Sequence, residues 1–130
     1  MLAALEALVK LESPTEDLQA CQDVIKLASN LATKVLGTPA EIRDVNGRPV
    51  FWWGANNPEV VVLAHLDTVW PKGSFTPLWK VEGTKATGPG IFDMKAGFIQ
   101  ALYAMKGITG SVALVATTDE ETGSATSKEF

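Results

Sequence analysis

The stretch VVVLAHLD, from Val60 to Asp67, decides the fold class of this chain. Its first five residues are apolar and mostly β-branched, and no polar residue alternates with them, which predicts a strand buried on both faces. His65 and Asp67 follow at the point where that strand should end. Strands buried on both faces are typical of parallel or mixed sheets covered by helices, so the stretch indicates an α/β protein.

A second apolar run, residues 112–116, predicts another buried strand, and the acidic segment Asp119-Glu120-Glu121 follows it closely. Between the two strands, apolar residues at helical spacing predict a helix from Asp93 to about Met105, with Asp93 in its first turn. In open α/β sheets, ligands bind where loops converge at the carboxyl ends of the strands. The polar residues after these strands are therefore the candidates for a functional site.

The N-terminal part of the chain is predicted to be helical. Apolar residues at helical spacing indicate an amphipathic helix over residues 2–12, which the segment Ser13-Pro14 ends. Thr15 is expected to cap a second helix, and Gly37 is expected to end it.

The next region is predicted to be rich in β-structure. Asn46-Gly47 is typical of a tight β-hairpin, here between strands at residues 40–45 and 48–53. A second hairpin-like piece is expected over residues 79–87. The order of helices and strands predicts an α/β fold, a three-layer α/β/α sandwich with a mixed, partly parallel central sheet.

Composition excludes several classes of protein. The net charge of -4, with the basic residues scattered along the chain, argues against a nucleic-acid partner. No apolar run is long enough to span a bilayer, and the N-terminus lacks the pattern of a signal peptide, so no membrane association and a cytoplasmic location are expected. Cys21 is the only cysteine, which excludes an intramolecular disulfide and a cysteine-based zinc site.

His65 and Asp67 have the spacing of a metal ligand and its supporting acid. Residues two apart on an extended chain point the same way, so Asp67 can accept the imidazole N–H that a metal does not use. A loop histidine with a solvated acid nearby is the alternative. Asp93 follows a glycine-rich turn at a helix start, where an aspartate is often only an N-cap.

The acidic segment Asp119-Glu120-Glu121 suggests a bound cation, because adjacent carboxylates repel one another and a dication would relieve that cost. On an extended segment Glu120 and Glu121 would face opposite ways, so one can bind metal while the other stays free as a base. A solvated acidic turn is the alternative. One histidine with several carboxylates matches hydrolytic zinc sites, and it suits two metals about 3.5–4 Å apart.

Three motifs carry a resemblance to the co-catalytic zinc exopeptidases. This family includes glutamate carboxypeptidases of the carboxypeptidase G type, aminoacylases, acetylornithine deacetylase and succinyl-diaminopimelate desuccinylase. The motifs are, in order, HLDTV (65–69), GPGIFDMKAG (88–97) and TDEETGS (118–124).

The resemblance implies a role for each candidate residue. His65 would bind one Zn²⁺ ion with Asp67 orienting it, Asp93 would bridge two Zn²⁺ ions, and Glu121 would bind the second. Glu120 would be the catalytic base that takes a proton from the water activated by the metals. The Asp93–Met94 peptide bond would be cis, and Co²⁺ or Mn²⁺ are expected substitutes for zinc.

The resemblance also implies what lies beyond this chain. Residues 1–130 would be the N-terminal portion of a truncated catalytic domain, without the inserted dimerisation domain and the C-terminal part. The family needs a further acidic ligand and a second histidine, whereas this sequence has one histidine. We therefore expect weak zinc binding and little or no activity from residues 1–130 alone, and a homodimer when the protein is complete.

The expected function is zinc-dependent hydrolysis of amide bonds in small peptides or N-acyl amino acids. A metallo-carboxypeptidase of the glutamate carboxypeptidase type is preferred, and an N-acyl-amino-acid deacylase is the alternative within the family. A non-catalytic metal-binding or assembly module is a third reading, since four tryptophans could form an exposed aromatic surface. These are Trp52, Trp53, Trp70 and Trp79.

Overall fold

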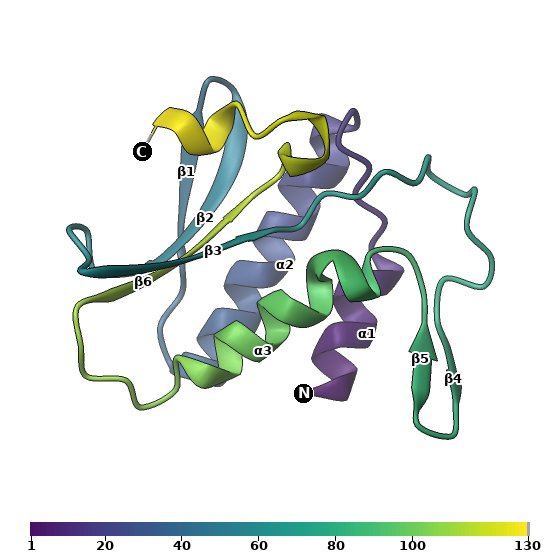
Figure 1. The fold of residues 1–130 in the computed structure, drawn as a ribbon, viewed down its shortest axis with the longest axis horizontal. Helices are drawn as coiled ribbons and strands as arrows, with labels where there is room; N and C mark the ends of the chain where they lie inside the picture. Colours follow the sequence, from purple (N-terminus) through teal and green to yellow (C-terminus); the bar gives the residue numbers. More distant parts are fainter. Residues whose placement is uncertain (130) are drawn as a thin grey trace.

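The computed structural model describes residues 1–129. Its main elements, drawn in Figure 1, are α1 (Leu2–Lys10), α2 (Leu18–Leu36), β1 (Glu41–Val45), β2 (Arg48–Gly54), β3 (Val60–His65), β4 (Lys80–Glu82), β5 (Lys85–Thr87), α3 (Ala96–Ala104) and β6 (Val112–Thr117). Short helical turns span Ile91–Lys95, Glu120–Thr122 and Thr126–Glu129.

The four-stranded sheet is mixed, as the sequence predicts. Its strand order is β1-β2-β6-β3, with β1 and β6 antiparallel to β2 and with β3 parallel to β6. The chain passes from β3 to β6 through α3, which is the helical crossover that neighbouring parallel strands require. The predicted α/β class is therefore confirmed.

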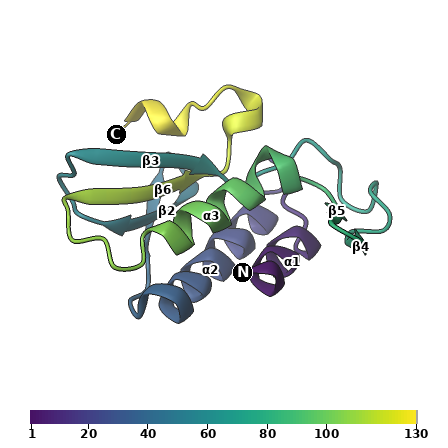
Figure 2. The ribbon, with the colours of Figure 1, turned by 60° about the horizontal axis from the view of Figure 1, so that its bottom comes forward.

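The three helices α1, α2 and α3 cover one face of the sheet (Figure 2). Phe51 of β2 and Phe98 of α3 meet edge to face in this core, with ring centroids 5.2 Å apart. The opposite face buries four side chains: Val50, Trp52, Ala113 and Val115. The segment after β6 returns on that side of the sheet (Figure 2), and among residues 1–129 no second layer of α-helices covers it.

Strand β3 differs from the prediction of a strand buried on both faces. Val60, Val61 and Leu63 are 55%, 49% and 52% exposed. The reason is that β3 pairs only with β6 among the described strands, so it forms an edge of the sheet. Its apolar sequence is that of a central strand, but residues 1–129 cover it on the helix side only.

Both long N-terminal helices form as predicted, but the cap of α2 differs. Asp17, rather than Thr15, is the N-cap, and its carboxylate accepts a hydrogen bond of 2.9 Å from Ala20 N. Thr15 is buried and bonds elsewhere. At the other end of α2, Gly37 adopts the left-handed conformation (φ 82°) that terminates helices.

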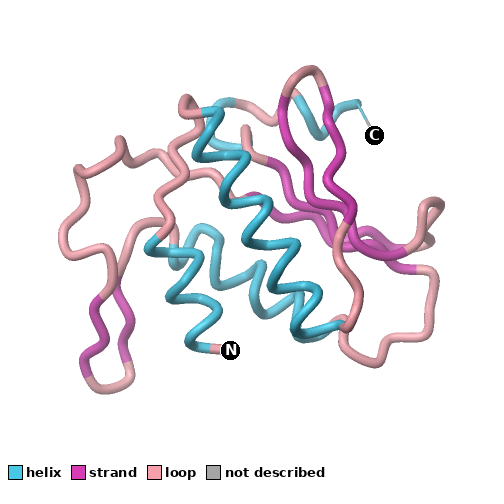
Figure 3. The backbone as a smooth tube through the Cα atoms, turned by 180° about the vertical axis from the view of Figure 1, so that it is seen from behind, coloured by secondary structure: helices cyan, strands magenta, loops and turns pink. Residues whose placement is uncertain are grey.

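Both predicted hairpins form. Asn46 (φ 53°) and Gly47 (φ 80°) make the β1–β2 turn, with the two positive φ angles that a type I′ turn requires. The β4–β5 hairpin projects away from the rest of the chain (Figures 1 and 3). No helix among residues 1–129 is both long and apolar enough to cross a bilayer.

Candidate metal centre and active site

The parallel pairing of β3 and β6 brings two of the sequence motifs together. In the ladder, His65 at the end of β3 lies opposite Thr117 at the end of β6. Leu66 N then donates to Thr117 O at 3.0 Å, which continues the pairing one step beyond the strands. The segments 65–67 and 119–121 therefore leave the sheet side by side, at the carboxyl ends of the two strands, where α/β proteins bind their ligands.

His65 is buried, and its Nε2 atom faces two carboxylates. It lies 3.0 Å from Asp93 Oδ1 and 3.8 Å from Glu120 Oε2. Burial alone would lower the pKa of His65, but contacts with Asp67 and Asp93, together with the charge of Glu120, raise this pKa to about 9. A histidine that ligates a metal ion is neutral at that nitrogen, so a metal ion bound here at neutral pH would displace a proton from His65.

Asp67 is fully buried, and its carboxylate lies on the Nδ1 side of the His65 ring. Its Oδ1 lies 3.2 Å from His65 Nδ1, an ion-pair contact at an angle that does not make a well-directed hydrogen bond. Its Oδ2 accepts from the Thr15 hydroxyl at 2.8 Å, and the backbone N–H groups of Glu120 and Glu121 donate to Oδ1 and Oδ2 at 3.4 and 3.2 Å. Burial would raise the pKa of Asp67, but these contacts lower it.

Asp93 does not take the predicted position in the first turn of α3. It lies in the preceding turn Ile91–Lys95 with extended backbone angles (φ -124°, ψ 101°), and α3 begins at Ala96. The Asp93–Met94 peptide bond is cis, as the resemblance implies. The side chain of Asp93 is 72% exposed, and its carboxylate points toward His65 rather than capping the helix.

Glu120 and Glu121 converge instead of facing opposite ways. They lie in the short 3₁₀-helix Glu120–Thr122, not on an extended segment, so the alternation expected of a strand does not apply. His65, Glu120 and Glu121 each offer one ligand atom, and these atoms lie within 4.8 Å of one another. Burial is the main cause that raises the pKa of Glu121, and the charges of Asp93, Asp67 and Glu120 act in the same direction.

Asp119 is not part of this cluster, although a bound cation was expected to relieve the repulsion among all three adjacent carboxylates. It is buried, and its Oδ2 accepts from both the backbone N–H and the hydroxyl of Thr126, each at 2.8 Å. It therefore closes the loop after β6.

Two clefts are lined in part by Asp93. One, of about 230 Å³, has His65, Asp93 and Glu120 among its lining residues. Another, of about 320 Å³, is lined in part by Asp93 and Glu121. Asp93 thus borders both clefts, between the two glutamates.

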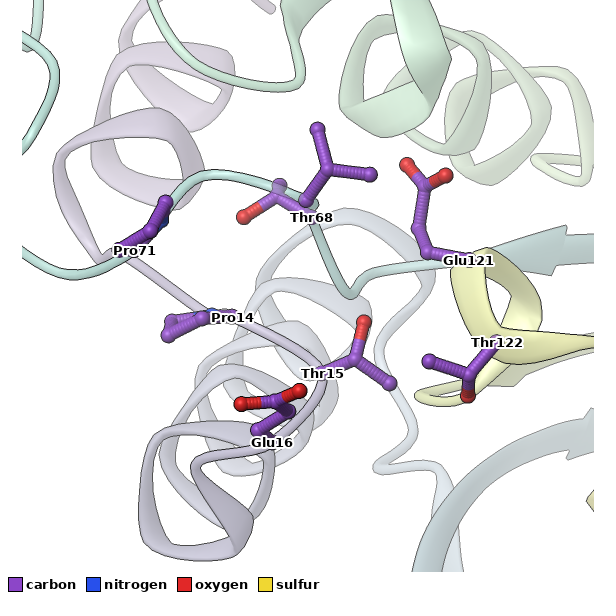
Figure 4. A pocket seen from close by; sticks show the side chains of 8 residues that line it. Pro14, Thr15, Glu16, Thr68, Pro71, Glu121 and Thr122 are labelled. Carbon is purple, nitrogen blue, oxygen red and sulfur yellow. The ribbon is translucent and has the colours of Figure 1, made fainter.

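A further cleft of about 280 Å³ opens beside Glu121. Figure 4 shows Glu121 and Thr122 on one side of it, Pro14, Thr15 and Glu16 on the other, and Thr68 and Pro71 along its rim.

Thr15 and Arg48 are site residues that the sequence reasoning missed. Besides the bond from Thr15 to Asp67, Arg48 Nη1 donates to Thr15 O at 2.8 Å and to Thr118 O at 2.9 Å. These bonds tie the start of α2 to the ends of β3 and β6. The only local signal near Thr15 is the break at Ser13-Pro14. It predicts a helix cap at Thr15 and does not indicate a hydrogen bond to Asp67.

The donor set suits a transition metal such as zinc. One imidazole and three carboxylates supply the nitrogen and oxygen ligands that zinc accepts, and Mn²⁺ and Co²⁺ accept the same types. The separation of the ligand atoms is short enough for one ion to touch several of them.

Comparison with known proteins gives the family. The profile of Peptidase family M20/M25/M40 matches residues 61–130, slightly more than half of the chain. Carboxypeptidase G2 from Pseudomonas sp. (strain RS-16) is 36% identical over an alignment of 85 residues, and the match covers 59% of this chain and 20% of that protein. The match to this relative therefore covers about a fifth of its length.

Solved structures share the fold. The M20 family metallo-carboxypeptidase Sso-CP2 from Sulfolobus solfataricus superposes with a TM-score of 0.77 at 20% identity, covering 98% of this chain and 32% of that one. Human carnosine dipeptidase 1 gives a TM-score of 0.74 at 19% identity, covering 98% and 33%. On the profile match across residues 61–130, this chain belongs to Peptidase family M20/M25/M40.

Proposed function

We propose that the complete protein hydrolyses amide bonds of small peptides with the help of two Zn²⁺ ions, as a carboxypeptidase. The observation that carries this proposal is the meeting of His65, Asp93, Glu120 and Glu121 at the carboxyl ends of β3 and β6. Membership in a peptidase family supports hydrolysis. The 36% identity to carboxypeptidase G2 supports the carboxypeptidase branch.

The proposed metal ligands are His65, Asp93 and Glu121. Bound zinc would lower the pKa of a water molecule and polarise the carbonyl of the scissile amide. Asp93 is the proposed bridge, because it borders both the cleft with His65 and the cleft with Glu121. Asp67 contacts the imidazole on its Nδ1 side, so the Nε2 atom, which faces Asp93, is the one proposed to bind the metal.

Glu120 is the proposed catalytic base. Its side chain is half exposed and lines the cleft shared with His65 and Asp93, with Oε2 3.8 Å from His65 Nε2. A carboxylate in this position can take a proton from the attacking water and pass it to the leaving amine. The backbone N–H bond from Glu120 to Asp67 fixes the turn that presents it.

One experiment on the complete protein distinguishes a catalytic base at position 120 from a metal ligand. Glu120→Gln should lower kcat by about 10²–10⁴-fold, the range supplied by a positioned base, while bound zinc per chain stays within about twofold of wild type. Turnover and metal content would be measured together. The exposed Glu59 offers a matched control, and Glu59→Gln should change neither quantity. Loss of zinc in Glu120→Gln would show that Glu120 is a ligand instead.

An N-acyl-amino-acid deacylase is the second candidate, because the same residues can support hydrolysis of a peptide bond or of an N-acyl amide bond. The two activities differ in the substrate: a carboxypeptidase prefers an amino-acid or peptide residue on the acyl side of the scissile amide, whereas a deacylase prefers a simple acyl group there. Comparing kcat/KM for matched dipeptides and N-acetyl amino acids decides between them. A complete protein that binds zinc but cleaves neither would instead support a non-catalytic metal-binding module.

We further propose that residues outside this chain complete the site with another acidic ligand and a second histidine. The chain covers about a third of the solved relatives, which leaves most of such a protein to supply them. The inserted dimerisation domain, the homodimer and the cytoplasmic location remain predictions.

A further inference from the structure

Lys95 is a buried cation that the proposed mechanism does not use. It is two residues after Asp93, and its side chain has no solvent exposure. Its Nζ donates to the backbone carbonyls of Leu8 at 2.9 Å and Leu11 at 3.0 Å, both at the end of α1. We propose that Lys95 is a positioning residue, which holds the Asp93 carboxylate in the metal site by tying its turn to the end of α1. This inference rests on the proposed function.

The end of α1 is a suitable anchor for an ammonium group. The last carbonyls of a helix lack partners within the helix and carry partial negative charge. Lys95 satisfies two carbonyls there, and among residues 1–129 no carboxylate lies within ion-pair distance of its Nζ. Burying an ammonium is costly, and an apolar side chain of similar length could fill the same space. The contacts with α1 are what distinguish lysine at this position.

The anchor acts on Asp93 through the backbone. Lys95 N donates to Gly90 O at 2.8 Å and closes the turn that contains Asp93. The other end of this turn is packed tightly, because a Cβ atom at Gly90 (φ 68°) would lie 2.6 Å from Thr68 Cγ2. The Asp93 turn is therefore clamped between the 65–68 segment on one side and α1 on the other.

The carboxylate of Asp93 depends on this clamp more than the carboxylate of Asp67 does. Asp67 has four partners that hold its carboxylate, whereas the described contacts of the Asp93 carboxylate are all with His65. The Asp93 side chain is also 72% exposed, so packing does little to orient it. Its placement must come from the turn, and the turn is held by Lys95.

The test is a double-mutant cycle on metal affinity in the complete protein. Co²⁺ would be titrated, with its visible spectrum as the readout, into wild type, Lys95→Met, Asp93→Asn and the double variant. We expect Lys95→Met to weaken Co²⁺ binding about 10- to 100-fold, as loss of a residue supporting a ligand typically does. In the Asp93→Asn background the same change should cost less than about twofold, because the group that Lys95 positions is gone.

Two further variants separate positioning from general stability. Lys95→Arg keeps the donors and should bind Co²⁺ more tightly than Lys95→Met, and it serves as the test if Lys95→Met does not fold. Leu31→Ala removes a buried core side chain of α2, and it should lower the melting temperature without changing Co²⁺ affinity.

Additive effects of Lys95→Met and Asp93→Asn would overturn the inference, and so would an unchanged Co²⁺ affinity in Lys95→Met. A wild-type protein that binds no metal would overturn the proposed function itself, which is a distinguishable result.

Discussion

At the scale of single residues, Asp67 contacts several groups of the site and not only the imidazole of His65. Its two oxygens are shared among groups from three stretches of the chain: the Thr15 hydroxyl, the His65 ring and the N–H groups of Glu120 and Glu121. Movement of this one buried carboxylate would therefore disturb the proposed metal ligand and the proposed base together. Thr15 supplies the shortest of these contacts.

Thr15→Val tests this arrangement, because valine keeps the shape and removes the donor. Loss of a hydrogen bond to a buried charged group should cost about 1.5–3 kcal/mol in the free energy of unfolding. It should also lower kcat/KM about tenfold or more, through the shifted Asp67. Urea denaturation and steady-state kinetics of the complete protein would measure both.

Thr33→Val is the matched control, since the exposed Thr33 hydroxyl only bonds back to Ser29 O within α2. If both variants behaved alike, Thr15 would have no special link to the site.

At the scale of secondary-structure elements, local signals predict α1, α2 and both hairpins because neighbouring residues decide them. Asn46-Gly47 sets its turn through positive φ angles, and Gly37 ends α2 in the same way. The predictions that Thr15 caps α2 and that Asp93 lies in the first turn of α3 were wrong, because contacts between distant residues override local preference. Thr15 bonds Asp67, 52 residues away, which leaves the capping position to Asp17.

The cap of α2 gives a pH-dependent prediction. The hydrogen bond from Ala20 N lowers the pKa of Asp17, against a smaller effect of burial, and Lys72 acts in the same direction as the bond. A lowered pKa means that the ionised cap stabilises the fold above the unfolded-state pKa of 3.8, and that this is lost as pH falls through the folded-state pKa.

Asp17→Ala should therefore lower the melting temperature of the complete protein at pH 6. The gap to wild type should narrow as the pH falls below 4. Asp17→Asn keeps a good N-cap without the charge, so its melting temperature at pH 6 should lie between those of wild type and Asp17→Ala. Thermal unfolding followed by circular dichroism would show this, and a gap independent of pH would contradict it.

At the scale of the whole molecule, the site depends on the parallel pairing of β3 with β6. The sequence predicts both strands and the polar residues after them, but neither their adjacency nor their register can be read from local pattern. The register that sets His65 opposite Thr117 brings segment 65–67 beside residues 119–121, although more than 50 residues separate them. Asp119 shows the limit: only the folded loop reveals that it faces Thr126 and not the cluster.

The central claim is that His65, Asp93 and Glu121 hold metal while Glu120 remains free. The most direct test is anomalous diffraction at the zinc absorption edge from crystals of the complete, zinc-loaded protein. We predict two peaks about 3.5–4 Å apart, with His65 Nε2 about 2.0–2.1 Å from one, Glu121 on the other and Asp93 between them. Peaks remote from these side chains, or a zinc bound by Glu120 with Glu121 turned away, would contradict the account.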